Sequence, residues 1–260
     1  MRGIAAARAQ QACGQLAAVD RYAASIAAVI ARALSLLPPG RHEHARTPGR
    51  LALVLFCAEQ GFAGAFSERV LDAAGTDLGT SELFIAGTRG GASLAERRIK
   101  PGWQGAMPSH SPGIPKLAAT IGTALYARLA TGDIHRLDAI FCQWQPGHGT
   151  RAVRQTLFPL EPAAFPTSAG APAPLLNLAP AVLLETLTAD YLHAQLCHAA
   201  LHSFAAENEA RMEAMAAAHT QTERQFSSLQ ATQRRVRQEE ITAEIIELAA
   251  GEAASRERAA

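Results

Sequence analysis

The sequence predicts an α/β protein with a long N-terminal helix, a small central α/β domain and a still longer C-terminal helix. All 14 prolines lie between Pro38 and Pro180, and so do 17 of the 20 glycines. Because these residues are the poorest helix formers, both ends of the chain should be helical and the middle rich in turns. In that middle, apolar strand-like runs alternate with helical segments, as in an α/β layer. The pattern excludes an all-β protein and an even βα repeat along the whole chain.

The first helix is expected over residues 1–37, where apolar side chains recur every three or four positions. Its buried stripe should consist of Leu16, Val19, Ala23, Ile26, Ile30, Ala33 and Leu37. Pro38-Pro39-Gly40 should end it, since proline lacks an amide donor and glycine relaxes the backbone. Residues 1–40 are therefore expected to form the N-terminal helical segment.

The central segment, residues 41–180, is expected to hold a small sheet between two linkers, 41–50 and 161–180. Strands are expected at 51–57, 83–86 and 137–144, with a fourth candidate at 156–160, and helices at 66–74 and 116–130. The first run, LALVLFC, is continuously apolar, which suits a strand buried on both faces. The fourth candidate belongs at an edge, because Pro159 cannot donate a ladder hydrogen bond.

The C-terminal segment, residues 181–260, should be one long helix, because residues 181–250 contain neither proline nor glycine. Seventy helical residues would span about 105 Å, more than the core of a soluble domain, so the helix must pack against a partner. Its apolar stripe is intermittent, with Gln233 and Glu240 at heptad positions that need apolar residues. The N-terminal helix, laid antiparallel, is the natural partner.

Composition narrows the class of protein. The chain has 260 residues, a formal net charge of +1 and 48% hydrophobic residues, which fits one or two folded domains and no nucleic-acid partner. Its four cysteines fit no zinc or redox spacing, so reduced, mostly buried thiols and a cytoplasmic location are expected. No apolar run is long enough to span a membrane, and a signal peptide is not expected at the start.

Two kinds of site are weighed against plainer structural roles. The Gly61–Gly64 turn after the first strand could bind a phosphate, but it lacks the third glycine of a dinucleotide loop and the Lys-Ser/Thr of a P-loop. A tight strand-to-helix turn explains it as well, and the same holds for Gly87–Gly91. His198 and His202, four apart on a helix, could bind a metal but lack a fixed third ligand. No metal, cofactor or catalytic residue is expected.

One stretch carries a specific resemblance. Residues 237–251 read R-Q-E-E-I-T-A-E-I-I-E-L-A-A-G and resemble the C-terminal signature of the γ subunit of F-type ATP synthases, R-Q-x-x-I-T-x-E-I/L-x-E-I-V-x-G. Upstream, residues 203–215 are similar to the family's S-x-x-S-E-x-x-A-R-M-x-A-M. The matching positions there are Ser203, Glu207, Ala210, Arg211, Met212, Ala214 and Met215.

The middle of the chain resembles the same family more distantly. The first strand and its turn are similar to an apolar strand followed by S-D-x-G-L-C-G-x-F-N; Gly61, Gly64 and Phe66 match, while Glu59 and Ala63 replace the Asp and Cys. Residues 83–91 resemble a short strand ending in G-x-K-G. Overall the chain is most similar to the divergent γ subunits of a secondary ATPase set in some bacteria.

The resemblance implies a rotor shaft. The family fold is an antiparallel coiled coil of N- and C-terminal helices with a small Rossmann-like α/β foot. Its partners would be the α and β subunits of the hexameric head, the ε subunit and the membrane c-ring. The subunit would be non-catalytic and peripheral, at the cytoplasmic face of the bacterial inner membrane, and would couple ion transport to ATP synthesis or hydrolysis.

The resemblance also implies contact residues. In the family, the C-terminal motif contacts the catch loops of the β subunits, which carries over to Arg237, Gln238, Thr242 and Glu244. Met1 matches a methionine near the same bearing region. Because the segment from Met1 to Arg8 resembles an internal family segment, M-x-M-V-A-A-x-K, the chain is expected to be a fragment or to carry a late start assignment.

Two rival functions remain open at this point. One is a small α/β enzyme that binds a nucleotide at the Gly61–Gly64 turn. The other is a coiled-coil adaptor that dimerises through residues 181–260.

Overall fold

The computed structural model describes residues 2–34, 36, 50–132, 134–145, 148–160 and 176–259. Residues 41–49 and 161–175 of the two expected linkers therefore lie outside the described residues, as does Met1. The chain divides into two compact units, Met1–Ala214 and Met215–Ala260.

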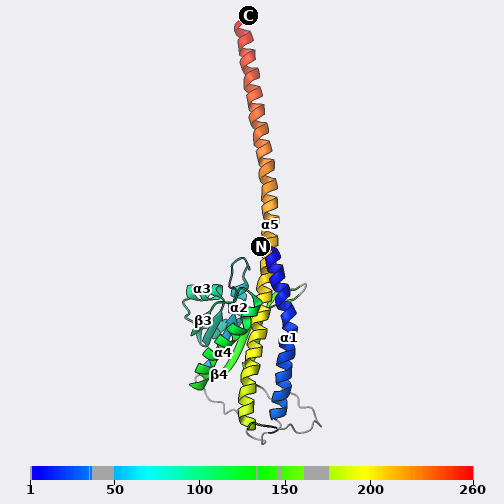
Figure 1. Cartoon of the computed structure of the whole chain (residues 1–260). Coiled ribbons are helices and arrows are strands. Elements are labelled where there is room, and N and C mark those ends of the chain that lie inside the picture. The colour runs from blue at the N-terminus through cyan, green and yellow to red at the C-terminus, as the bar shows by residue number, and fades with distance from the viewer. Residues whose placement is uncertain are drawn as a thin grey trace. The chain divides into compact units, whose positions relative to one another are not determined.

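A five-stranded sheet forms the centre of the first unit (Figure 1). Its strand order is β3-β2-β1-β4-β5, in which β3, β2, β1 and β4 are parallel and β5 is antiparallel to β4. The strands are β1 (Arg50–Phe56), β2 (Glu82–Ala86), β3 (Trp103–Gly105), β4 (Ile134–Gln145) and β5 (Gly149–Phe158). The central place of β1 explains its unbroken apolar run, because both of its faces are covered.

Helices cover both faces of this sheet. Alternate residues of β1 point to opposite faces, as strand geometry requires: Val54 and Phe56 to one core, Leu53 and Leu55 to the other. The first core also contains α4 (Ile114–Ala130) and part of α5 (Pro180–Ala259). The second contains α2 (Phe66–Ala74), α3 (Thr88–Glu96) and the short 3-10 helix η1 (Gly75–Gly79). A second 3-10 turn, η2 (Ser111–Gly113), precedes α4.

The helix α1 (Arg2–Leu34) packs antiparallel against the part of α5 that belongs to the first unit (Figure 1). Near its C-terminal end, Ile26 and Ile30 share a core with Leu184 and Leu187 of α5. Nearer its N-terminus, Ala12 shares a core with residues further along α5. Ala23, Ile26, Ile30 and Ala33 of the predicted stripe are buried, and Leu16 and Val19 are partly buried. The predicted Leu37 lies outside the described residues.

The second unit is the C-terminal part of α5. The long helix predicted for residues 181–260 is observed as Pro180–Ala259 and continues through Gly251. Every residue from 217 to 253 is exposed, including the apolar Phe226, Leu229 and Ile245. No helix in the described part of the chain combines the length and apolarity needed to cross a membrane.

The structure departs from the prediction in the central domain. The helix α3 and the strand β3 were not expected, and β5 begins at Gly149 rather than Thr156. Helix α3 begins with Thr-Arg-Gly-Gly, a poor helix former, and β3 has only three residues. Arg151 and Arg154 interrupt the apolar pattern of β5, and Arg154 is held by ion pairs to Asp77 and Asp138. The edge position predicted for this strand is confirmed.

Candidate functional site

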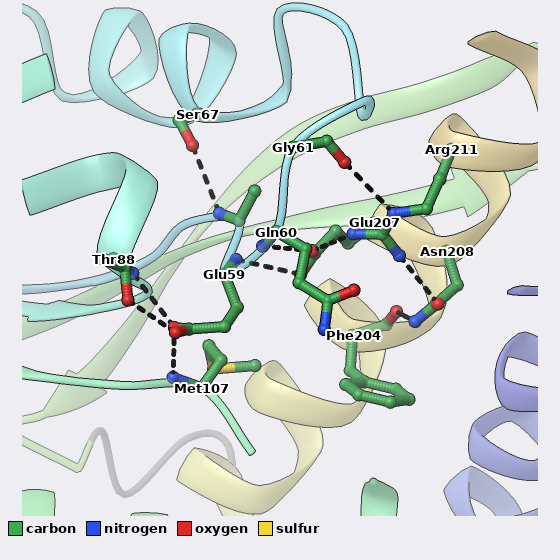
Figure 2. Close-up of polar contacts among 11 residues, drawn as sticks. Glu59, Gln60, Gly61, Ser67, Thr88, Met107, Phe204, Glu207, Asn208 and Arg211 are labelled. Atoms are coloured by element: carbon green, nitrogen blue, oxygen red, sulfur yellow. Dashed lines mark hydrogen bonds and ion pairs between the residues drawn. The ribbon is translucent and has the colours of Figure 1, made fainter. Parts of the chain in front are cut away.

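Polar side chains of α5 contact the chain segment that leaves β1 (Figure 2). Ser203, Glu207 and Arg211 are spaced four residues apart, so they lie along one side of the helix. Ser203 Oγ donates a hydrogen bond of 2.8 Å to the carbonyl oxygen of Phe56, the last residue of β1. This hydrogen bond is buried and joins positions 147 residues apart.

Glu207 provides the negative charge of this contact. Its carboxylate accepts hydrogen bonds from the backbone N–H groups of Glu59 (3.3 Å) and Gln60 (3.2 Å) and forms an ion pair with Arg211. Only 5% of the Glu207 side chain and 6% of the Arg211 side chain are exposed. Burial raises the pKa of Glu207, and the Arg211 guanidinium and the backbone donors partly oppose that shift.

Arg211 completes the contact from the next helical turn. Its Nε donates to the carbonyl oxygen of Gly61 at 3.2 Å, and a terminal nitrogen donates to Asn208 Oδ1 at 2.9 Å. The Asn208 amide in turn donates to the Phe204 carbonyl oxygen at 2.8 Å. The buried guanidinium therefore has partners on three sides, as a buried charge requires.

Glu59 extends the contact across the sheet (Figure 2). Its carboxylate accepts hydrogen bonds from the Thr88 N–H (3.0 Å), the Thr88 hydroxyl (2.5 Å) and the Met107 N–H (2.9 Å). Thr88 begins α3 just after β2, and Met107 follows β3. One carboxylate thus links the ends of three neighbouring strands. We call Glu59, Gln60, Gly61, Ser203, Glu207, Asn208 and Arg211 together the joint.

The contacts of Glu59 argue against a phosphate site beside the Gly61–Gly64 turn. Glu59 occupies the donors at the start of α3, where a phosphate would bind in many α/β sheets. The space beside Glu59 and Gln60, which is also lined by Arg8 and by α5, has a volume of only about 10 Å³, enough for at most one water molecule. Phe62 and Gly64 have φ values of 62° and 59°, so the segment is a tight turn. The plainer of the two predictions for these glycines fits the structure.

The two histidines meet at the contact between α1, α5 and β4. Their Nε2 atoms are 3.1 Å apart, and Asp20 of α1 lies 3.4 Å from His198 Nε2. Both rings pack against Phe141. Burial lowers the pKa of His198, and burial together with His198 lowers that of His202 to about 4. Among the described residues no group of three metal-ligating side chains is arranged to hold an ion.

Burial also makes three of the four cysteines unreactive. Cys57, Cys142 and Cys197 are buried, as expected, whereas Cys13 is exposed. Burial raises the pKa of Cys142 to about 12 and that of Cys197 to about 11, so neither is a thiolate near neutral pH.

The residues predicted to contact β subunits lie in the second unit. Arg237, Gln238, Thr242 and Glu244 are all exposed on α5. By helical spacing, Arg237 and Glu244 share one side of the helix, and Gln238 and Thr242 share a neighbouring side. Thr242 Oγ1 donates to the Gln238 carbonyl oxygen at 2.8 Å. Met1, predicted for the bearing region, is outside the described residues.

A family model described as ATP synthase matches residues 1–254. The chain belongs to the ATP synthase γ-subunit family. The ATP synthase gamma chain of Streptomyces griseus is 28% identical over 80% of this chain and 73% of its own length. That of Streptomyces avermitilis is 27% identical over 98% of this chain and 89% of its own length.

Solved structures show the same fold. A chain of the Euglena gracilis mitochondrial ATP synthase (OSCP/F1/c-ring) superposes with a TM-score of 0.61 at 12% identity, covering 95% of this chain and 94% of its own. A chain of the Tetrahymena thermophila central stalk/c-ring gives a TM-score of 0.58 at 16% identity, covering 84% and 97%. The nucleotide-binding enzyme and the homodimeric adaptor are not favoured by these γ-family relationships.

Sequence reasoning placed Ser203, Glu207 and Arg211 in a family motif but gave them no contact. Glu207 and Arg211 form an i,i+4 ion pair, and no prediction from the sequence indicated its burial against the β1 turn. The sequence offers one signal for this contact. Ser203, Glu207 and Arg211 are polar residues four positions apart in an alanine-rich stretch, so they share one side of the helix. The role of Glu59 was missed, although its place beside the turn was noted.

Proposed function

We propose that this γ-family chain is the non-catalytic rotor shaft of an F-type ATP synthase. It couples ion passage through a membrane ring to ATP synthesis or hydrolysis on neighbouring β subunits. The observation that carries the proposal is the family match over residues 1–254, which covers both terminal helices and the sheet between them. The reaction itself belongs to the β subunits.

The helices supply the shaft. The antiparallel packing of α1 on α5 in the first unit supports an antiparallel coiled coil with a Rossmann-like α/β foot. In this proposal residues 1–40 and 181–260 form the shaft, and residues 41–180 form the foot and its linkers. A shaft that carries torque needs paired helices, because an isolated helix is held only by its own hydrogen bonds.

The exposed part of α5 supplies the sliding contacts. We propose that Arg237, Gln238, Thr242 and Glu244 meet the β subunits, with Met1 near the same bearing. Guanidinium, amide and carboxylate groups form hydrogen bonds of about 1–3 kcal/mol each, weak enough to be exchanged as the shaft turns. The exposure of all four side chains supports this role.

The remaining partners follow from the same proposal. The foot would contact the c-ring and the ε subunit, and the complex would place this chain at the cytoplasmic face of a bacterial inner membrane. No cofactor and no nucleic acid is involved.

The test is reconstitution with α and β subunits. The chain should assemble with them, and Arg237→Ala and Thr242→Val should lower the turnover of the assembled complex several-fold. Arg224→Ala and Thr232→Val are matched controls, because Thr232 makes the same hydrogen bond to the residue four positions earlier (3.1 Å). A stable monomer that binds neither the α nor the β subunits would overturn the proposal. Stoichiometric nucleotide binding by the isolated chain would instead favour the nucleotide-binding α/β enzyme.

A further inference from the structure

The joint connects α5 to the segment that leaves β1 through several buried or partly buried polar contacts. Ser203 binds the Phe56 carbonyl oxygen, Glu207 binds two successive N–H groups, and Arg211 binds the Gly61 carbonyl oxygen. Three side chains on one side of a helix thus bind both donors and acceptors of one short backbone segment. Hydrogen bonds of this kind are directional, so they oppose rotation of α5 about its own axis.

The rest of the contact between α5 and the sheet is mostly apolar. Leu192, Leu196, Ala199 and Ala200 pack in the core beneath the sheet. The hydrophobic effect that favours such packing is not directional. A neutral hydrogen bond of 2.9 Å between Gln155 and Gln195 is a further polar contact with the edge strand β5. Among the hydrogen bonds described above between α5 and the sheet or its loops, those of the joint are charged and buried, which favours the joint as a place where rotation is resisted.

We infer that the joint transmits torque between the C-terminal helix and the foot, with Glu207 and Arg211 as its positioning residues. This inference rests on the proposed function, since it assigns the rotor a site through which force passes. Glu59 carries the connection onward, because its carboxylate binds the start of α3 and the segment after β3. A turn of α5 therefore moves β1, β2 and β3 together.

The joint can be tested in the assembled complex reconstituted in vesicles. Glu207→Gln removes the charge but keeps the shape, and Arg211→Lys keeps the charge but cannot reach Gly61, Asn208 and Glu207 together. Arg211→Ala removes the contact. We expect normal assembly and ATP hydrolysis within about twofold of the unmodified complex, because the β subunits still meet the exposed part of α5.

The ion transport driven by that hydrolysis should fall instead. We expect ions pumped per ATP to drop several-fold in Arg211→Ala, with Arg211→Lys between it and the unmodified chain. Glu252→Gln and Arg256→Ala are matched controls, since this pair has the same i,i+4 spacing but side chains that are 66% and 80% exposed. Unchanged pumping per ATP in Arg211→Ala and Glu207→Gln would overturn the inference.

A second measurement keeps the two proposals apart. In the full chain without partners, amide hydrogen exchange at Glu59 and Gln60 should be at least tenfold faster in Glu207→Ala than in the unmodified chain. Exchange in Glu252→Ala should not change. Equal exchange rates in Glu207→Ala and the unmodified chain would contradict the inference about the joint, even if the chain assembled. Failure of the unmodified chain to assemble would contradict only the proposed function.

Discussion

Ser203 shows how one hydroxyl connects distant parts of this chain. It lies in the middle of a helix, where serine is usually a poor choice because it competes for backbone hydrogen bonds. Here Ser203 is only 1% exposed, and its hydroxyl donates a hydrogen bond to the carbonyl oxygen of Phe56 at the end of the central strand β1. The local cost to the helix is therefore offset by a buried contact with the sheet.

Replacing this serine should reveal that contribution. Ser203→Ala leaves the Phe56 carbonyl oxygen without its buried donor, so we expect the free energy of unfolding to fall by about 1–3 kcal/mol. Denaturant titration followed by circular dichroism measures it. Thr220→Ala is the control, because that hydroxyl also lies on α5 but is exposed and bonds only to its own helix. A loss equal to that of the control would show that the contact adds nothing.

Elements differ in how far the sequence determines them. Helix α2 was predicted with its observed bounds, because an amphipathic segment ends at Gly75, whose φ of 54° suits glycine. Strand β1 was found from its apolar run alone. The strand β3 is three residues long and owes its place to β2 beside it, which no local pattern encodes. The joint was hidden for the same reason, since Glu207 and its donors are 147 and 148 residues apart.

The contact between α1 and α5 should depend on pH through its histidines. An unfolded histidine has a pKa of about 6.5, whereas burial and the neighbouring His198 lower that of His202 to about 4 in the folded chain. Between these values the unfolded chain binds more protons. The stabilising contribution is therefore complete above pH 6.5 and is lost as the pH falls toward 4.

Thermal unfolding from pH 7.5 to 4.5 measures this effect. The facing groups are His198 on the same helix and Asp20 on α1, with the uncharged Phe141 on β4. His202→Gln should give a shallower decline of the melting temperature than the unmodified chain. His219→Gln, at an exposed position, should leave the slope as it was. Parallel curves for all three proteins would contradict the expectation.

At the scale of the whole molecule, the two units differ in how they are stabilised. The first has three hydrophobic cores and buried charges, whereas residues 217–253 of the second are all exposed. Apolar side chains of the second unit, such as Leu248, which is 75% exposed, do not stabilise the chain by burial in a core. Such a helix keeps only its own hydrogen bonds until another surface covers it.

The two units should therefore differ in their rates of amide hydrogen exchange. In the isolated chain, amides of residues 217–253 should exchange at least a hundredfold faster than those of β1, because local opening there exposes no core. On assembly with α and β subunits, the same amides should become protected, and those of β1 should change little. Slow exchange of residues 217–253 in the isolated chain would mean that they already have a partner, as a homodimer would give them.

The joint also has a consequence for evolution and for engineering. The backbone of residues 56–61 and the side chains of residues 203–211 were matched to each other, although a whole domain separates them in the sequence. A chimaera that takes its α/β domain from one relative and its helices from another must therefore move the nine positions from Ser203 to Arg211 together with the domain. We expect divergent relatives to keep both partners of such a contact together, even where the surrounding surface residues differ.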